Sequence, residues 1–224
     1  MYRRTIVFIF GFLFITTASA QDNLSFLAQP QLTIEYKVTD RYKQSFALEN
    51  RNFIYKDADW NAQVKHLEVS HFSRYEYKKG NHFGVGVRYR FEENFQRSKE
   101  NEFRLLQQYA WKQKKTMFIL KQRIRNEQRF YASITKYRFR YELGIDFPIG
   151  KSFGTVTYFK TATESLLEIA HTQKPEWEQR LSGVFTWQFS KKTDLELGVQ
   201  YRLGDYTQKI GHELFLIAGL GIEL

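Results

Sequence analysis

The chain has 224 residues, of which 42% are hydrophobic and 17% aromatic, and its formal net charge is +10. This length suits one β-barrel domain, and the absence of cysteine excludes disulfides and thiolate metal sites. The basic residues alternate regularly with aromatic residues instead of forming a cluster, which argues against a nucleic-acid partner.

The first 20 residues are typical of a secretory signal peptide. Two arginines precede an apolar run over 6–15, and the small residues Ala18 and Ala20 follow at the expected cleavage site. The run is shorter than the roughly 20 residues that a membrane-spanning helix needs. We therefore expect removal of residues 1–20, which leaves 21–224 as a single exported domain.

Residues 134–147 show a pattern that recurs along the chain. Alternate positions from Tyr137 to Phe147 are aromatic or aliphatic, and those between them, from Lys136 to Asp146, are mostly charged. Successive side chains on a strand point to opposite faces, so this pattern predicts a strand with one apolar face and one charged face. Eleven segments are predicted as strands, in chain order at about 32–38, 46–53, 64–77, 83–92, 102–111, 118–130, 134–147, 153–164, 177–189, 195–203 and 211–224.

Turn and loop signals separate these segments. Residues 78–81 (KKGN) favour a tight turn because Gly and Asn tolerate positive φ. Residues 148–151 also predict a turn, and 164–174 predict a longer loop. Residues 101–130 fit a helical spacing as well, but the two-residue alternation that resumes after Thr116 favours strands.

Alternation alone fits either a soluble barrel with its aromatic face inside or a membrane barrel with that face outside. Three features favour the membrane. Many segments reach 10–14 residues, against the roughly 9–11 that cross a bilayer. Their large apolar side chains would overfill the interior of a small barrel. Aromatic residues gather near strand ends, as interfacial girdles require, at Tyr77, Trp111, Trp177, Trp187, Phe189 and Tyr206.

We therefore predict an all-β fold, a closed antiparallel up-and-down transmembrane β-barrel in the bacterial outer membrane. Bacterial barrels of this class have an even number of strands. We accordingly expect 12 strands, with 10 as the alternative, and a twelfth strand would come from residues 22–30 despite Pro30.

Several segments resemble a known family of bacterial outer-membrane proteins. These are EFRLLQQ (102–108), RIRNEQRF (123–130), RFRYEL (138–143), EQRLSGVF (178–185) and LELGVQYRL (195–203). The chain is similar over most of its exported part to the family filed as domain of unknown function 2490, known from Bacteroidetes and related bacteria. The resemblance implies a β-barrel and no particular activity.

The charged face would line the lumen. The predicted lumen-lining charge network contains Arg88, Arg90, Glu92, Glu102, Arg104, Arg123, Arg125, Glu127, Arg129, Arg138, Arg140, Glu142, Glu178, Arg180, Glu196, Arg202 and Glu213, together with Glu49 and Arg51. Buried charges must be paired and hydrogen-bonded, so we expect a salt-bridged interior and a structural or interaction barrel. Because arginine outnumbers glutamate, the alternative is a narrow, weakly anion-selective channel.

Enzymatic chemistry is not predicted. The histidines lie in separate segments, and no serine occupies a nucleophile elbow. His66 and His71 are five residues apart, on opposite faces of one strand, so they are not a metal pair. No metal, cofactor or catalytic residue is therefore expected, although a lipid-modifying outer-membrane enzyme and a soluble ligand-binding barrel stay open. The glycine pairs at 84–86 and 219–221 are expected to make room for arginine side chains.

The expected partners follow from the expected location. They are outer-membrane lipid and lipopolysaccharide around the wall, and the outer-membrane barrel assembly machinery during insertion. We expect the protein to act as a monomer.

Overall fold

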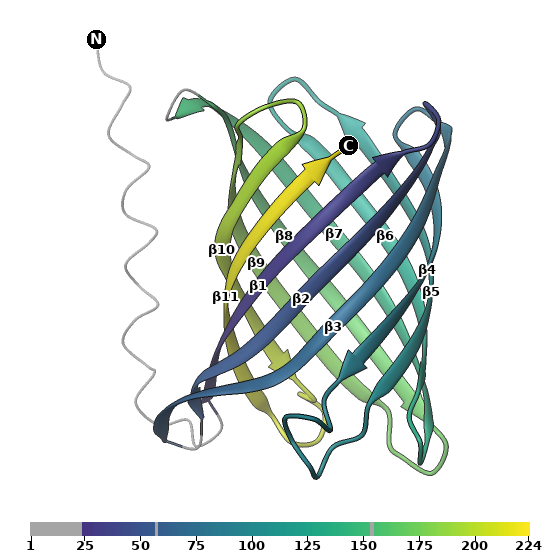
Figure 1. Cartoon of the computed structure of the whole chain (residues 1–224), viewed down its shortest axis with the longest axis vertical. Coiled ribbons are helices and arrows are strands. Elements are labelled where there is room, and N and C mark those ends of the chain that lie inside the picture. Colours follow the sequence, from purple (N-terminus) through teal and green to yellow (C-terminus); the bar gives the residue numbers. More distant parts are fainter. Residues whose placement is uncertain (1–23, 57, 153–154) are drawn as a thin grey trace.

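The computed structural model describes residues 24–56, 58–152 and 155–224. Within them the chain forms one closed barrel of tilted strands (Figure 1). The strands are β1 (Leu24–Lys37), β2 (Tyr42–Lys56), β3 (Asp59–Lys78), β4 (Asn81–Phe91), β5 (Glu102–Lys114), β6 (Ile119–Phe130), β7 (Thr135–Ser152), β8 (Thr155–Ala170), β9 (Glu176–Gln188), β10 (Thr193–Gly204) and β11 (Gly211–Glu223). The predicted signal peptide lies outside the described residues.

Each of the eleven alternating segments is a strand, so the pattern is confirmed, including over 101–130, where β5 and β6 replace the helical alternative. Two predicted interruptions are wrong. At 148–151 the chain does not turn: β7 continues through a β-bulge, which Gly150 permits with a φ of 121°. The loop predicted over 164–174 is confined to 171–175, because β8 continues to Ala170.

The barrel closes between its first and last strands. The described residues form eleven strands, one below the expected twelve, and an up-and-down sheet with an odd count brings its first and last strands together in parallel. The expectation of antiparallel pairing throughout is therefore wrong at this one pair, where Leu24 lies opposite His212 and Glu35 opposite Glu223. The pairing leaves no free sheet edge.

Residues 22–30 do not form a separate strand. Their described part, from Leu24, is the first half of β1. Pro30 is accommodated there: it is matched with Ala218 of β11, while the β2 ladder has pairs at Ala28 and Gln31 but none between them. A proline has no N–H to donate at that position.

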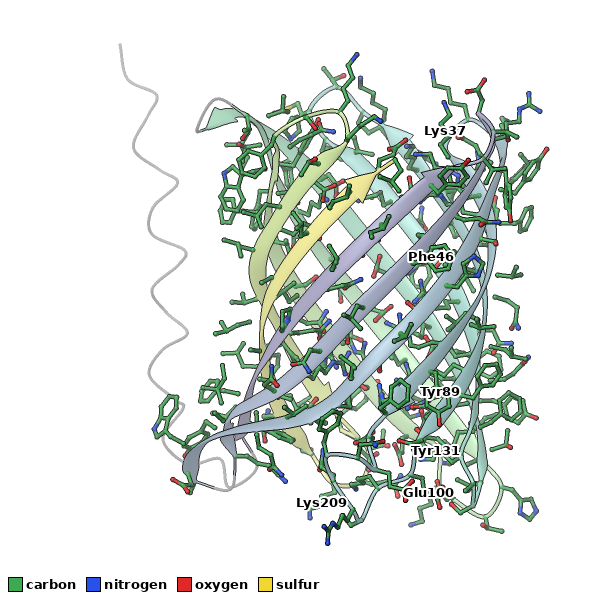
Figure 2. All side chains as sticks on the ribbon, viewed as in Figure 1. Lys37, Phe46, Tyr89, Glu100, Tyr131 and Lys209 are labelled. Carbon is green, nitrogen blue, oxygen red and sulfur yellow. The ribbon has the colours of Figure 1, made fainter. Side chains whose placement is uncertain are left out.

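The two ends of the barrel differ in their connections. At the turn end, where Lys37 and the C-terminus lie, the strands are joined by short connections such as 38–41, 79–80 and 189–192 (Figures 1 and 2). At the loop end, where Tyr131, Glu100 and Lys209 lie (Figure 2), the connections include 92–101 and 205–210. The described residues contain no helix long and apolar enough to cross a membrane.

The wall has its apolar side chains outside. Of the described residues, thirty-six large hydrophobic side chains are exposed, among them Phe46 at 53% and Leu216 at 51%, whereas five are buried. Leu27, Phe53 and Phe215 form a small apolar cluster inside. Most other fully buried side chains are charged or polar. This distribution is the reverse of that in a soluble barrel.

Aromatic residues form clusters on the outer wall near both ends. At the turn end the rings of Tyr77 and Phe83 lie 5.1 Å apart, and those of Tyr109 and Trp111 lie 5.2 Å apart. At the loop end the ring of Tyr55 lies 5.5 Å from that of Phe26 and 5.3 Å from that of Trp60. Such pairs contribute about 0.5–1.5 kcal/mol each beyond their burial.

The outer wall also carries polar side chains, which hydrogen-bond to one another across strands. The Asn126 amide donates to the Gln107 side chain (3.2 Å). The Ser165 hydroxyl donates to Gln179, whose amide donates in turn to the Thr163 hydroxyl, both at 2.6 Å. These pairings reduce the cost of removing such groups from water.

The glycine pair at 84–86 makes room for an aromatic ring, not for arginine as predicted. A Cβ at Gly84 or at Gly86 would lie 2.4 Å from the ring of Phe72, which faces the interior from β3. Arg125 lies over this ring at 5.8 Å. At the second pair, a Cβ on Gly221 would lie 2.6 Å from the carboxylate of Asp194, so an acid occupies that space.

Candidate functional site

The charged face of the strands packs into a network of ion pairs inside the barrel, which we call the charged belt. It runs around the inner wall from β3 to β9. Its members are Glu68, Arg88, Arg90, Glu102, Arg104, Arg123, Glu127, Arg129, Lys136, Arg138, Arg140, Glu142, Glu164, Glu168, Glu178 and Arg180.

The belt begins at Glu68, which is 1% exposed. Its carboxylate accepts hydrogen bonds from Arg88 (2.8 Å) and Arg90 (2.5 Å), both on the neighbouring strand β4. Arg104 of β5 also reaches it, at 3.4 Å. The β3–β4 register sets Glu68 directly opposite Arg90. Strand pairing therefore delivers guanidinium groups to a carboxylate that could not otherwise be buried in its charged form.

Glu102 links the next strands. It is 0% exposed and lies against Arg104 of its own strand and Arg129 of β6. The Arg104 Nη2 atom lies 2.7 Å from Glu102 Oε2, and the Arg129 Nη2 atom lies 3.0 Å from the same oxygen. Arg90 contacts it at 3.3 Å. Planar guanidinium groups satisfy both oxygens of a carboxylate, which suits arginine to this role.

Glu168 of β8 continues the belt beyond Arg129. It pairs with Arg129, with Arg138 (2.7 Å) and with Lys136 (3.0 Å). Three cations on two different strands thus share one carboxylate. These ion pairs stabilise residues 164–170 as part of strand β8, where a loop was predicted.

Arg140 belongs to a second group of ion pairs in the charged belt, nearer the middle of the barrel than those of Glu102 and Glu168. It donates to Glu127 (2.6 Å) and to Glu164 (2.7 Å). Glu164 also contacts Arg123 at 3.0 Å and Arg180 at 3.5 Å. Each of these cations therefore has a carboxylate partner, and the whole arrangement fixes the register of several strands at once.

The remaining residues of the predicted network also face the interior but are not members of the charged belt. Glu196 pairs with Lys160 (2.6 Å), and Glu213 pairs with Lys65 (3.1 Å). Glu92, just after β4, contacts Arg90 at 3.5 Å. Glu49 contacts Arg51 at 2.8 Å.

Arg125 and Arg202 have no carboxylate contact within the part of the chain that the structure describes. Arg125 instead donates to Gln108, with 3.0 Å between Nε and Oε1. Arg202 donates to Gln29 (3.2 Å) and lies over the ring of Phe215 at 3.7 Å. Stacking on an aromatic ring stabilises such a guanidinium without a countercharge.

The network predicted from sequence does not contain three central carboxylates of the charged belt: Glu68, Glu164 and Glu168. Glu164 and Glu168 fall within the loop predicted over 164–174. Glu68 lies within the strand predicted over 64–77, but the predicted network does not include it. The signal that identifies it is the register with β4, which sequence alone does not provide.

Two cavities open at opposite ends of the barrel. The loop-end cavity has a volume of about 770 Å³, and Arg90, Arg129 and Glu168 form part of its lining. The turn-end cavity has a volume of about 320 Å³ and is lined partly by Glu35 and Glu196. The two share no lining residue. Exposure varies within the charged belt: Glu127 is 0% exposed, whereas the side chains of Arg123 and Glu142 are 24% and 29% exposed.

Tyr131, in the connection between β6 and β7, lies at the edge of the loop-end cavity. Its hydroxyl oxygen accepts a hydrogen bond of 2.6 Å from Arg129. Burial raises the pKa of Tyr131 to about 12 despite the adjacent guanidinium. The phenol is therefore protonated at neutral pH.

Three of the histidines can be placed on the inner or the outer face of the wall. His66 faces the interior and is 0% exposed, whereas His71 lies on the outer wall with its ring 4.7 Å from that of Phe46. The predicted separation of these two onto opposite faces is confirmed. His212, also on the outer wall, is 2.6 Å from the hydroxyl of Tyr201.

The sequence was compared with known families and with curated proteins. Residues 30–212 match the family described as "Protein of unknown function (DUF2490)". The chain belongs to this family. No curated protein matches. The DUF2490 match covers β2 to β10 in full, and with them every strand of the charged belt.

Proposed function

We propose that this DUF2490 protein is an integral barrel of the bacterial outer membrane, with a bore closed by its own ion pairs. The observation that carries the proposal is the reversed distribution of side chains, with aromatic and aliphatic groups outside and paired charges inside. A closed sheet satisfies every backbone group within the wall, which a bilayer requires. The strands have 11 to 20 residues, long enough to cross it when tilted.

The partners follow from this placement. Lipid and lipopolysaccharide contact the apolar wall, and the barrel assembly machinery inserts the chain. The closed sheet leaves no strand edge for pairing with a second copy, in keeping with a monomer.

A structural or interaction role is better supported than conduction. An anion channel requires guanidinium groups that face water, but Arg104 and Arg129 are buried against carboxylates. The ligand-accessible space lies at the two ends, above and below the belt. The larger loop-end cavity, surrounded by the longer connections, is the natural contact surface for a molecule outside the cell.

Two experiments test the proposal. First, the full chain is expressed in a Gram-negative host, and its membranes are extracted and run on a gel with and without heating. We expect the protein in the outer-membrane fraction, with faster migration of the unheated form. Recovery in the soluble periplasmic fraction without detergent would contradict membrane insertion and favour a soluble ligand-binding barrel.

Second, the purified barrel is reconstituted into planar bilayers. We expect no discrete conductance. Anion-selective steps that decrease in Arg138→Ala or Arg140→Ala, but not in the turn-end variant Arg74→Ala, would overturn the closed bore and establish the channel alternative.

A further inference from the structure

His66 is buried inside the barrel with both ring nitrogens unpaired. Its side chain is 0% exposed, and neither Nδ1 nor Nε2 has a hydrogen-bond partner. A neutral imidazole has one N–H donor and one acceptor. Leaving such groups unpaired in the interior costs free energy, so a buried ring of this kind requires an explanation.

Two buried carboxylates lie beside the ring. One ligand atom from each of Glu49, His66 and Glu68 can be chosen so that all three lie within 4.8 Å of one another. The His66 Nε2 atom lies 3.5 Å from Glu68 Oε1. Glu49 Oε1 lies 2.8 Å from Arg51 but forms no hydrogen bond of acceptable geometry. The unpaired imidazole and the incompletely bonded Glu49 carboxylate therefore belong to the same small buried cluster.

A β-bulge produces this arrangement. Arg51 of β2 is opposite His66, and the next pair is Asn52 with Val64, so Lys65 is the extra residue on β3. Lys65 and His66 both point inward as a result, since Lys65 reaches Glu213 across the interior at 3.1 Å. Bulges commonly redirect a side chain at functional sites.

We propose that Glu49, His66 and Glu68 bind a divalent transition-metal ion of the Zn²⁺ type. One imidazole nitrogen with carboxylate oxygens suits Zn²⁺, whereas Mg²⁺ and Ca²⁺ prefer oxygen ligands alone. Ligand atoms about 2.0–2.2 Å from a tetrahedral ion lie roughly 3.3 Å from each other. His66 and Glu68 nearly meet that spacing already, and Glu49 would need to move by at most about 1.5 Å. A water would complete the coordination.

The surrounding cations limit the affinity but do not exclude the ion. Arg51 contacts Glu49, and Arg88 and Arg90 contact Glu68. Arg104 also contacts Glu68, at 3.4 Å, so three guanidinium groups share its two oxygens. A carboxylate offers about four lone-pair positions, and the ion would take the position that the long Arg104 contact occupies. The arginines orient the ligands in the way that hydrogen-bonded partners orient them at known metal sites. The ion would enter through the loop-end cavity, which Lys65 and Arg90 line.

The test is metal binding by the folded barrel in detergent micelles. The protein is treated with EDTA, exchanged into buffer and titrated calorimetrically with ZnCl₂ and, separately, with MgCl₂. We expect one tight Zn²⁺ site per chain, no comparable Mg²⁺ site, and Zn²⁺ affinity reduced at least tenfold in His66→Phe and in Glu49→Gln. His71→Phe, on the outer wall, is the matched control and should bind as the wild type does.

Folding is checked for each variant by its heat-dependent gel migration. If His66→Phe does not fold, the Zn²⁺ affinity of Glu49→Gln and X-ray absorption of the zinc-loaded wild type test the site instead. The X-ray absorption spectrum should show one imidazole nitrogen among oxygen ligands. Absence of a Zn²⁺ site in the wild type, equal affinity in Glu49→Gln, or an all-oxygen or multi-histidine ligand shell would overturn the proposal. The proposal needs only the fold, so it stands or falls independently of the closed bore.

Discussion

Replacing Glu102 by glutamine tests the energetic role of the charged belt. Glu102→Gln keeps the shape of the side chain and removes its charge. Arg104 would then retain only a contact of 3.4 Å with Glu68, and Arg129 would retain Glu168. The expected loss of unfolding free energy is therefore close to that from breaking one buried ion pair, and not two. Removing one partner of such a pair costs about 3–5 kcal/mol, and we expect destabilisation in that range.

The matched control is Glu142→Gln, the same substitution in a pair that is about a quarter exposed. Its partner Arg123 keeps Glu164 at 3.0 Å, so we expect a loss of about 1 kcal/mol or less. The measurement is urea unfolding of the barrel in detergent micelles or lipid vesicles, followed by tryptophan fluorescence. A Glu102→Gln variant within about 1 kcal/mol of the wild type would refute the view that these buried charges depend on one another.

Three further predictions concern the wall, the inner glycines and the loop end. Gly86→Ala places a methyl group 2.4 Å from an inward ring and should destabilise by about 1–3 kcal/mol, whereas Gly211→Ala, with nothing within 4 Å, should be nearly neutral in the same unfolding assay. In lipid vesicles Leu216→Arg, at mid-height of the outer wall, should lower the unfolding free energy by about 2–4 kcal/mol. Leu224→Arg, at the turn end, should lower it by about 0–1 kcal/mol. Equal losses in the two variants would contradict a bilayer around the wall. Because the pKa of Tyr131 is raised to about 12 in the fold, from about 10 in an unfolded chain, the folded state holds this proton more tightly. The unfolding free energy of the wild type should therefore be maintained below pH 10 and decrease as pH rises toward 12. The decrease should be larger than in Tyr131→Phe. Equal decreases in the two proteins would contradict a raised pKa for Tyr131.

Alternation allowed every strand to be predicted, because a half-apolar, half-charged strand has a period of two that no other element shares. The segment containing Tyr137 and Phe139 shows this most clearly. Sequence did not predict how the barrel closes. The even-number rule required a separate strand before Leu32, but the chain instead continues β1 through Pro30 and pairs it in parallel with β11.

Most members of the charged belt were predicted from the same alternation, but Glu68, Glu164 and Glu168 were not, and neither were the pairings. Which carboxylate meets which guanidinium depends on register, and register depends on turns and bulges whose effect is not local. The cluster at His66 illustrates the limit. Its second carboxylate, Glu49, comes from a neighbouring strand, and a bulge at Lys65 sets the geometry.

The central claim is that the aromatic and aliphatic side chains of the strands face lipid, and spin labels in lipid vesicles test it most directly. Because the chain has no cysteine, single cysteines can be introduced cleanly at Leu181, on the outer wall, and at Ala162, on the inner face of the adjacent strand. We predict that the label at Leu181 collides readily with oxygen dissolved in lipid and little with a water-soluble nickel complex, and that the label at Ala162 is shielded from lipid-dissolved oxygen. A label at Leu181 that is freely accessible to the nickel complex and shielded from lipid would contradict the membrane barrel.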